Sequence, residues 1–200
     1  MKIENNKILA LVLLLLCPIL SLLYSLCSVN IKKNNNIYFF CISLFFGLFV
    51  LKNPPIFDLY RYFNIFYDEK SLIEIILTTN DLFIPLVFFL FKDLSIPFFW
   101  ISPFIVSTGI FICLYTLSIL VKINEINISN RMFLFLILVL LILIEPIDLS
   151  LTLRFRLACI FASCGIIINI SNKKKGIVLI VLSVCTHLAI FPVILIYFSS

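Results

Sequence analysis

Long apolar runs, separated by short loops rich in Asn and Lys, are the feature that most constrains what this chain can fold into. Hydrophobic residues make up 63% of its 200 residues and charged residues only 12%, and the mean hydropathy is +1.22. A bilayer interior offers no water to satisfy exposed backbone groups, so runs of this kind cross it as helices. The sequence therefore predicts an all-α fold, a polytopic transmembrane helix bundle.

About six runs are predicted to be full spans, because roughly 20 apolar residues cross the ~30 Å hydrocarbon layer. These runs are residues 8–29, 37–51, 96–121, 132–144, 155–170 and 176–198. Residues 52–94 form the first large loop, which must lie outside the hydrocarbon or line a wet cavity. Its apolar part, residues 81–94, is short and is predicted to be an interfacial or re-entrant helix. Residues 1–200 are interpreted as a single integral membrane domain.

Basic loops indicate the orientation of these spans. The positive-inside rule places Lys32–Lys33, residues 122–131 and Lys173–Lys175 in the cytoplasm, which requires an even number of crossings between them. This holds if residues 81–94 do not span. Residues 52–94 and the connection at residues 145–154 then face outward. Lys2 and Lys7 also face outward in this arrangement, against the rule.

Charge and cysteine usage exclude several classes of partner. The net charge of +5 is spread over short loops, which is typical of a topology signal, so no nucleic-acid partner is predicted. The seven cysteines lie within apolar runs, without a C-x-x-C pair and without a neighbouring His or carboxylate at ligand spacing. We interpret them as small hydrophobic residues and predict neither a metal nor a cofactor.

Ionisable residues close to the hydrocarbon are functional candidates, because each costs several kcal/mol there. Five stand out: Asp58, Arg61, Arg154, Arg156 and His187. The segment Asn53-Pro54-Pro55 is typical of a helix start, and a helix over residues 55–67 would bring Asp58, Arg61, Tyr62 and Ile65 to one face. The alternative is a local Asp58–Arg61 ion pair beside interfacial tyrosines.

Arg154 and Arg156 cannot both point into one cavity once a helix has begun, because they lie about 200° apart around it. Arg154 shares its face with the small-residue stripe Ala158, Ala162, Gly165 and Asn169, which favours close approach of another helix. We therefore predict that Arg154 points into the bundle and that Arg156 faces lipid or a loose interface. Alternatively, both side chains snorkel to the membrane surface.

His187 is the only histidine and lies within the last apolar run. It is predicted to be a proton donor or acceptor, or a hydrogen-bond donor to a sugar or phosphate. The alternative is a hydrogen bond to a neighbouring helix.

The ordered set of these motifs resembles a known family. Asp58-Leu59-Tyr60-Arg61-Tyr62-Phe63-Asn64-Ile65-Phe66 resembles the D-x-x-R-Y-x-x-x-F pattern of EpsG-like membrane proteins of exopolysaccharide and capsule synthesis, relatives of Wzy-type repeat-unit polymerases. Arg154-Phe155-Arg156-Leu157-Ala158 is similar to their R-x-x-x-A helix start, and Thr186-His187-Leu188-Ala189 to their next helix. The resemblance covers residues 54–198. Such proteins have more spans, so we expect this chain to correspond to the N-terminal part of the family architecture.

The resemblance implies glycosyl transfer at the outer face of the bacterial cytoplasmic membrane, joining oligosaccharide units carried on polyprenyl diphosphate. Arginine suits the diphosphate leaving group, so Arg154 is expected to bind it with Arg61 or Arg156 in support. Asp58 is expected to deprotonate the attacking hydroxyl, with His187 as a further catalytic group and Tyr62 at a sugar. Other polysaccharide-synthesis membrane proteins are expected partners. Two alternatives are a transporter or flippase of lipid-linked glycans and a non-catalytic subunit of a synthesis complex.

Overall fold

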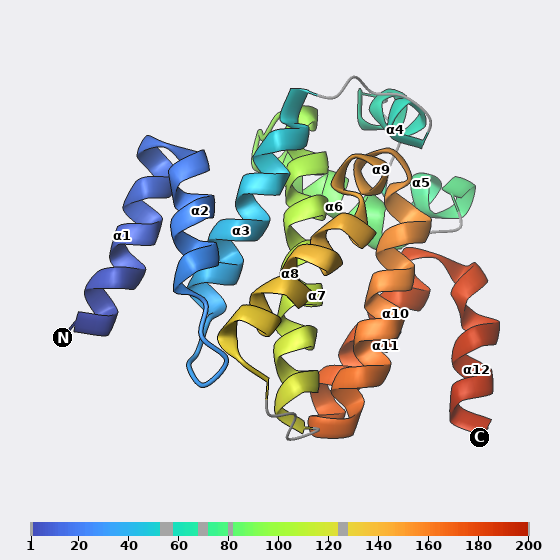
Figure 1. The fold of residues 1–200 in the computed structure, drawn as a ribbon. Helices are drawn as coiled ribbons and strands as arrows, with labels where there is room; N and C mark the ends of the chain where they lie inside the picture. Colours follow the sequence, from blue (N-terminus) through green and yellow to red (C-terminus); the bar gives the residue numbers. More distant parts are fainter. Residues whose placement is uncertain (1, 53–57, 68–71, 80–81, 124–127, 200) are drawn as a thin grey trace.

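The computed structural model describes residues 2–52, 58–67, 72–79, 82–123 and 128–199, and the side chains of these except residues 2–5, 52, 58, 59, 78 and 79. All regular structure in the described residues is helical (Figure 1). The α-helices are α1 (Lys2–Leu16), α2 (Pro18–Ser28), α3 (Asn36–Phe49), α4 (Asp58–Tyr67), α5 (Leu72–Thr79), α6 (Phe83–Asp93), α7 (Ile101–Ile123), α8 (Asn130–Ile144), α9 (Pro146–Leu151), α10 (Leu153–Ser171), α11 (Lys173–Thr186) and α12 (Phe191–Ser199). Short 3₁₀ turns are η1 (Val50–Lys52), η2 (Phe98–Trp100) and η3 (Leu188–Ile190).

Among the described residues, two helical segments are long and apolar enough to cross a membrane, Phe98–Ile123 and Leu153–Ser171. They match the predicted spans at residues 96–121 and 155–170. The helices α3, α8 and α11 have 14, 15 and 14 residues, which is roughly 21–23 Å at 1.5 Å per residue. The structure thus gives an all-helical fold with two candidate spans, and helix length does not support the six full spans that we expected.

The predicted span over residues 8–29 is wrong. The chain turns back at Cys17, whose φ and ψ of −152° and 93° are extended, so that α1 and α2 form a hairpin (Figure 1). Ser21 Oγ donates a hydrogen bond of 2.8 Å to the Ala10 carbonyl across it. Pro18 explains the break, because it lacks an N–H, clashes with the preceding turn and disfavours helical geometry at Cys17.

The predicted span over residues 176–198 is also broken. Helix α11 ends at Thr186, and His187 is extended, with φ −159° and ψ 112°. Pro192 explains the break, because a continuous helix would bring its ring against the carbonyl of Leu188. The Cys185 carbonyl at the end of α11 accepts a 2.9 Å hydrogen bond from the backbone N–H of Leu82.

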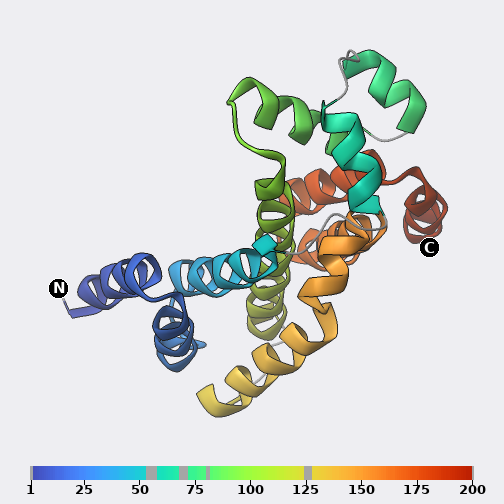
Figure 2. The ribbon, with the colours of Figure 1, turned by 90° about the horizontal axis from the view of Figure 1, so that it is seen from above.

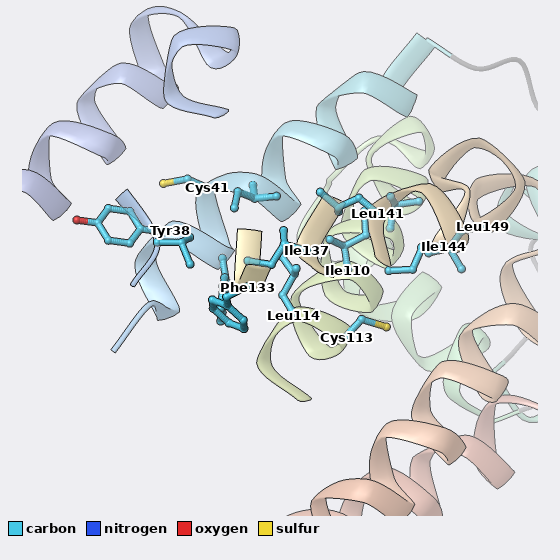
Figure 3. Packing of buried hydrophobic residues seen from close by; sticks show 14 of the residues in the cluster. Tyr38, Cys41, Ile110, Cys113, Leu114, Phe133, Ile137, Leu141, Ile144 and Leu149 are labelled. Carbon is cyan, nitrogen blue, oxygen red and sulfur yellow. The ribbon is translucent and has the colours of Figure 1, made fainter. Parts of the chain in front are cut away.

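Helix α7 is the central element, because other helices pack on several of its sides (Figure 2). Figure 3 shows one of its packed faces, where Ile110, Cys113 and Leu114 of α7 meet Phe133 and Ile137 of α8. The same cluster continues into α3 and α9. This core fixes α3, α7 and α8 relative to one another.

The most extensive helix contact joins α10 and α11. A Cβ added to Gly165 of α10 would lie 3.0 Å from the backbone nitrogen of Ile180, and one added to Gly176 of α11 would lie 2.4 Å from the Asn169 Cα. Ala158 and Ala162 of the same stripe are buried. The prediction that this stripe admits a closely packed helix is confirmed.

The helices gather many basic residues at one end of the molecule and the loop helices at the opposite end. At one end, called the basic end, lie the start of α1, the α2–α3 loop, the C-terminus of α7 and the N-terminus of α11 (Figure 1). Its described basic side chains are Lys7, Lys32, Lys33, Lys122, Arg131, Lys173, Lys174 and Lys175. At the other end, called the α4 end, lie α4, α5 and α9 (Figure 1).

Candidate functional site

The α4 end holds a site built where the loop helix α4 packs over the start of α10. Tyr62 of α4 is 0% exposed and makes an edge-to-face ring contact of 5.1 Å with Phe88 of α6. Phe66, one turn later, contacts Phe98 at 5.4 Å. These aromatic side chains belong to a core cluster that also contains Leu153 and Leu157 of α10. Apolar packing therefore holds α4 against α6 and α10.

Arg154 lies at this junction. Its Cζ is 5.8 Å from the centroid of the Tyr62 ring, which is within the range of a cation–π interaction. Arg154 is in the first turn of α10, where the helix dipole adds partial positive charge. A guanidinium and a helix N-terminus together favour an anion at this position. The structure thus joins Tyr62 and Arg154, two of the predicted site residues that are 92 positions apart in the sequence.

The predicted common face of the loop helix is only partly present. Helix α4 begins at Asp58, within the predicted range of residues 55–67, of which residues 55–57 lie outside the described part of the chain. Tyr62 is buried, whereas Arg61 is exposed. Neighbouring residues on a helix lie about 100° apart, so one of them turns to solvent when the other is buried. The Asp58 side chain lies outside the described residues, but its backbone is one turn from Tyr62.

Arg156 is held by two carboxylates. Its guanidinium is 3.1 Å from Glu145 Oε2 and 2.9 Å from Asp148 Oδ2. Glu145 ends α8 and Asp148 is in the first turn of α9, so the ion pairs join the α8–α9 corner to α10. Arg154 and Arg156 thus have different surroundings, as predicted, but Arg156 faces carboxylates where we expected lipid or a loose interface.

His187 lies at the break between α11 and η3 and not within a continuous last helix. Its ring makes an edge-to-face contact with Phe155, with centroids 5.9 Å apart. Phe155 follows Arg154 directly, so His187 lies beside the first turn of α10. The structure therefore brings His187 to the same helix start as Arg154 and Tyr62.

A large apolar groove lies between α3 and α7. It has a volume of about 480 Å³, with Phe91 of α6 and Trp100 of η2 at its lining. Phe91 belongs to the same buried cluster as Tyr62. The groove thus shares Phe91 with the apolar cluster that holds Tyr62 beneath Arg154.

Sequence reasoning missed two parts of this region. The carboxylates that pair with Arg156 could have been found from the sequence, because the segment Glu145-Pro146-Ile147-Asp148 lies shortly before the start of α10. The groove had no such signal, because its lining comes from two separate stretches, within residues 40–44 and 91–111, and is mostly made of ordinary apolar side chains. Within the described residues, no group of three or more His, Cys, Asp or Glu side chains is placed to hold a metal ion.

Comparison of the chain with protein-family models, with curated proteins and with solved structures finds no match. The resemblance to EpsG-like proteins therefore depends on the motif residues alone.

Proposed function

We propose that this chain is a multi-pass membrane protein that binds polyprenyl diphosphate-linked oligosaccharide at its α4 end and polymerises the units by glycosyl transfer, in surface polysaccharide synthesis. The observation that carries the proposal is the placement of Arg154 over Tyr62 at the junction of α4 and α10. A cation at a helix start suits the diphosphate head of the ligand, and the apolar groove between α3 and α7, which shares Phe91 with the cluster around Tyr62, offers a surface for the isoprenoid tail.

The charge distribution supports the orientation in this proposal. Cytoplasmic loops are enriched in Lys and Arg, so the basic end belongs in the cytoplasm and the α4 end outside. Helices α3, α7, α8, α10 and α11 would carry the chain between these ends, with the shorter ones matched by local thinning of the bilayer. The α1–α2 hairpin would enter from the cytoplasmic side and return to it. This places Lys7 with the other basic residues and removes the conflict with the positive-inside rule.

The reaction would use these residues in distinct roles. A hydroxyl of one oligosaccharide attacks the anomeric carbon of another, the bond from that carbon to the diphosphate oxygen breaks, and the hydroxyl proton passes to a base. Arg154 would stabilise the charge that grows on the diphosphate. Asp58, at the start of α4, would accept the proton, with His187 as a second proton acceptor or a donor to the sugar. Arg61 would support binding from the exposed side of α4. The buried Tyr62 would do so only by holding Arg154, and Arg156 only by exchanging a carboxylate for the ligand.

Binding of farnesyl diphosphate to the purified protein in nanodiscs tests the diphosphate site. Arg154→Gln should weaken binding by roughly 10–100-fold, which is the loss of a charged hydrogen-bonding partner of about 1.5–3 kcal/mol. Arg156→Gln is the comparison variant and should weaken binding less, by under about 3-fold, because Arg156 is held by Glu145 and Asp148 and would reach the ligand only by exchanging one of these carboxylates for it. Equal effects of the two variants, or no binding by the wild type, would contradict the proposal.

The Asp58→Asn variant tests the reaction itself. With lipid-linked oligosaccharide as substrate, this variant should lose chain elongation while farnesyl diphosphate still binds as in the wild type. Elongation that persists in the variant would remove Asp58 as the base. A wild-type protein that moves lipid-linked oligosaccharide across a vesicle membrane without elongating it would be a transporter. One that neither elongates nor moves the oligosaccharide would be a non-catalytic subunit.

A further inference from the structure

We propose that a polar pocket at the basic end binds the phosphate headgroup of an anionic membrane lipid. The pocket has a volume of about 460 Å³ and lies between the α1–α2 hairpin and the loop before α3. Its polar lining includes Lys7, Lys33, Asn6, Asn30, Asn34 and Tyr38. The inference depends on the membrane orientation proposed above, but not on the polymerisation reaction.

The lining has the chemistry of a phosphate site. Lys7 and Lys33 bring two ammonium groups from separate elements, and the lining residues that the structure describes include no Asp or Glu. The Asn30 Oδ1 accepts the backbone N–H of Lys32 at 3.0 Å, and the Asn34 Oδ1 accepts that of Asn36 at 3.0 Å. With these amide oxygens occupied by backbone donors, the NH₂ groups of both side chains remain as donors, which a phosphate accepts.

The loop that forms the pocket is held in shape by its own hydrogen bonds. Asn35 is almost fully buried; its Oδ1 accepts the Asn30 N–H at 3.1 Å and its Nδ2 donates to the Asn30 carbonyl at 2.9 Å. The Ile31 N–H donates to Asn130 Oδ1 at the start of α8, at 3.2 Å. A loop fixed at two points loses little conformational freedom on binding, which favours affinity.

The surroundings of the pocket favour a lipid over a soluble phosphate compound. It lies at the base of the α1–α2 hairpin, whose tip exposes Leu15 by 87% and Leu16 by 78%. Ile19 and Leu23 of α2 are also exposed. Apolar side chains exposed to this degree are suited to acyl chains, and the pocket is where the headgroup of the same lipid would lie. Basic pockets at the cytoplasmic face are typical sites for anionic headgroups.

The test is native mass spectrometry of the purified protein from nanodiscs of phosphatidylcholine with a minor share of phosphatidylglycerol. The wild type should retain phosphatidylglycerol, and the Lys7→Gln/Lys33→Gln variant should retain at least roughly 10-fold less, since it lacks both ammonium groups that line the pocket. Lys32→Gln is the matched control, because Lys32 is exposed in the same loop but does not line the pocket. It should retain phosphatidylglycerol like the wild type.

Three results would overturn the proposal. The first is an equal loss in the Lys32→Gln control, which would indicate general attraction to basic loops. The second is retention that is unchanged in the double variant. The third is displacement of phosphatidylglycerol by millimolar inorganic pyrophosphate together with pyrophosphate binding in pure phosphatidylcholine, which would indicate a soluble ligand. Farnesyl diphosphate binding should be unchanged in the double variant, so failure here is distinct from failure of the Arg154 site.

Discussion

Arg154 and Arg156 are separated by one residue but stabilise the molecule through different interactions. Arg154 lies over the buried ring of Tyr62, whereas Arg156 pairs with two carboxylates that are about half exposed. Salt screens exposed ion pairs but has little effect on a cation held against a buried ring. We expect Arg156→Gln to lower the free energy of unfolding by less than about 1 kcal/mol and Arg154→Gln by about 1–2 kcal/mol.

The salt dependence of the Arg156→Gln loss is the measurement that tests its ion pairs. Thermal unfolding in detergent at about 0.05 M and about 0.5 M salt should show this loss shrinking, because salt screens the exposed pairs with Glu145 and Asp148. A loss of the same size at both salt concentrations would mean that it does not come from these ion pairs.

Residue periodicity predicted that the two arginines have different surroundings, because small residues at helical spacing follow Arg154 and not Arg156. It did not predict the partners. The Tyr62 ring comes from a segment 92 residues earlier, and its position depends on how α4, α6 and α10 pack. The carboxylates of Arg156 depend on the corner at Glu145, which has a left-handed φ of 48°. Such a turn is uncommon for a residue other than Gly.

At the scale of elements, the α10–α11 pair is fixed by two glycines that leave no room for a methyl group. A Cβ added at Gly176 would lie 2.4–2.6 Å from three atoms of Asn169. Two of these atoms, the Asn169 Cα and backbone nitrogen, belong to the backbone and cannot move aside. We expect Gly176→Ala to lower the free energy of unfolding by about 1–3 kcal/mol, the usual cost of overpacking. Thermal unfolding in detergent measures this loss.

Gly109→Ala in α7 is the control for that prediction. Its nearest neighbour is the Leu149 Cδ2 at 3.1 Å, the end of a flexible side chain that can move. Alanine also gains about 1 kcal/mol of helix propensity over glycine, so this variant should be close to neutral. If Gly176→Ala proves as stable as Gly109→Ala, the two helices are not held at the distance that the structure gives.

The positions of most elements could be predicted from apolar runs, and the two breaks within predicted spans have one physical cause. Residues 8–29 and 176–198 are each long enough to span, but each contains a proline, Pro18 and Pro192. Proline is tolerated in many membrane helices, so its presence alone does not say whether the chain bends slightly or turns back. The turn at Cys17 is stabilised by contacts between α1 and α2, such as Ser21 with Ala10, which hydropathy does not encode.

For the whole molecule, the hairpin changes the topology more than any other feature. If residues 8–29 crossed once, Lys7 and Lys33 would be on opposite sides of the membrane. In the structure both line one pocket at the basic end. The basic loops could therefore be placed on one side from the sequence, but the position of the N-terminal segment required the fold.

Labelling of single cysteines tests this topology in intact cells. In a cysteine-free background, Lys7→Cys, Lys33→Cys and Lys174→Cys should react with a membrane-impermeant maleimide only after permeabilisation, because the proposed orientation places the basic end in the cytoplasm. Tyr67→Cys, on the exposed side of α4, should react from outside without it. If Lys7→Cys instead reacts from outside together with Tyr67→Cys, residues 8–29 cross the membrane as one span. Lys7 and Lys33 then cannot share a pocket, because a helix across the ~30 Å hydrocarbon layer would separate them.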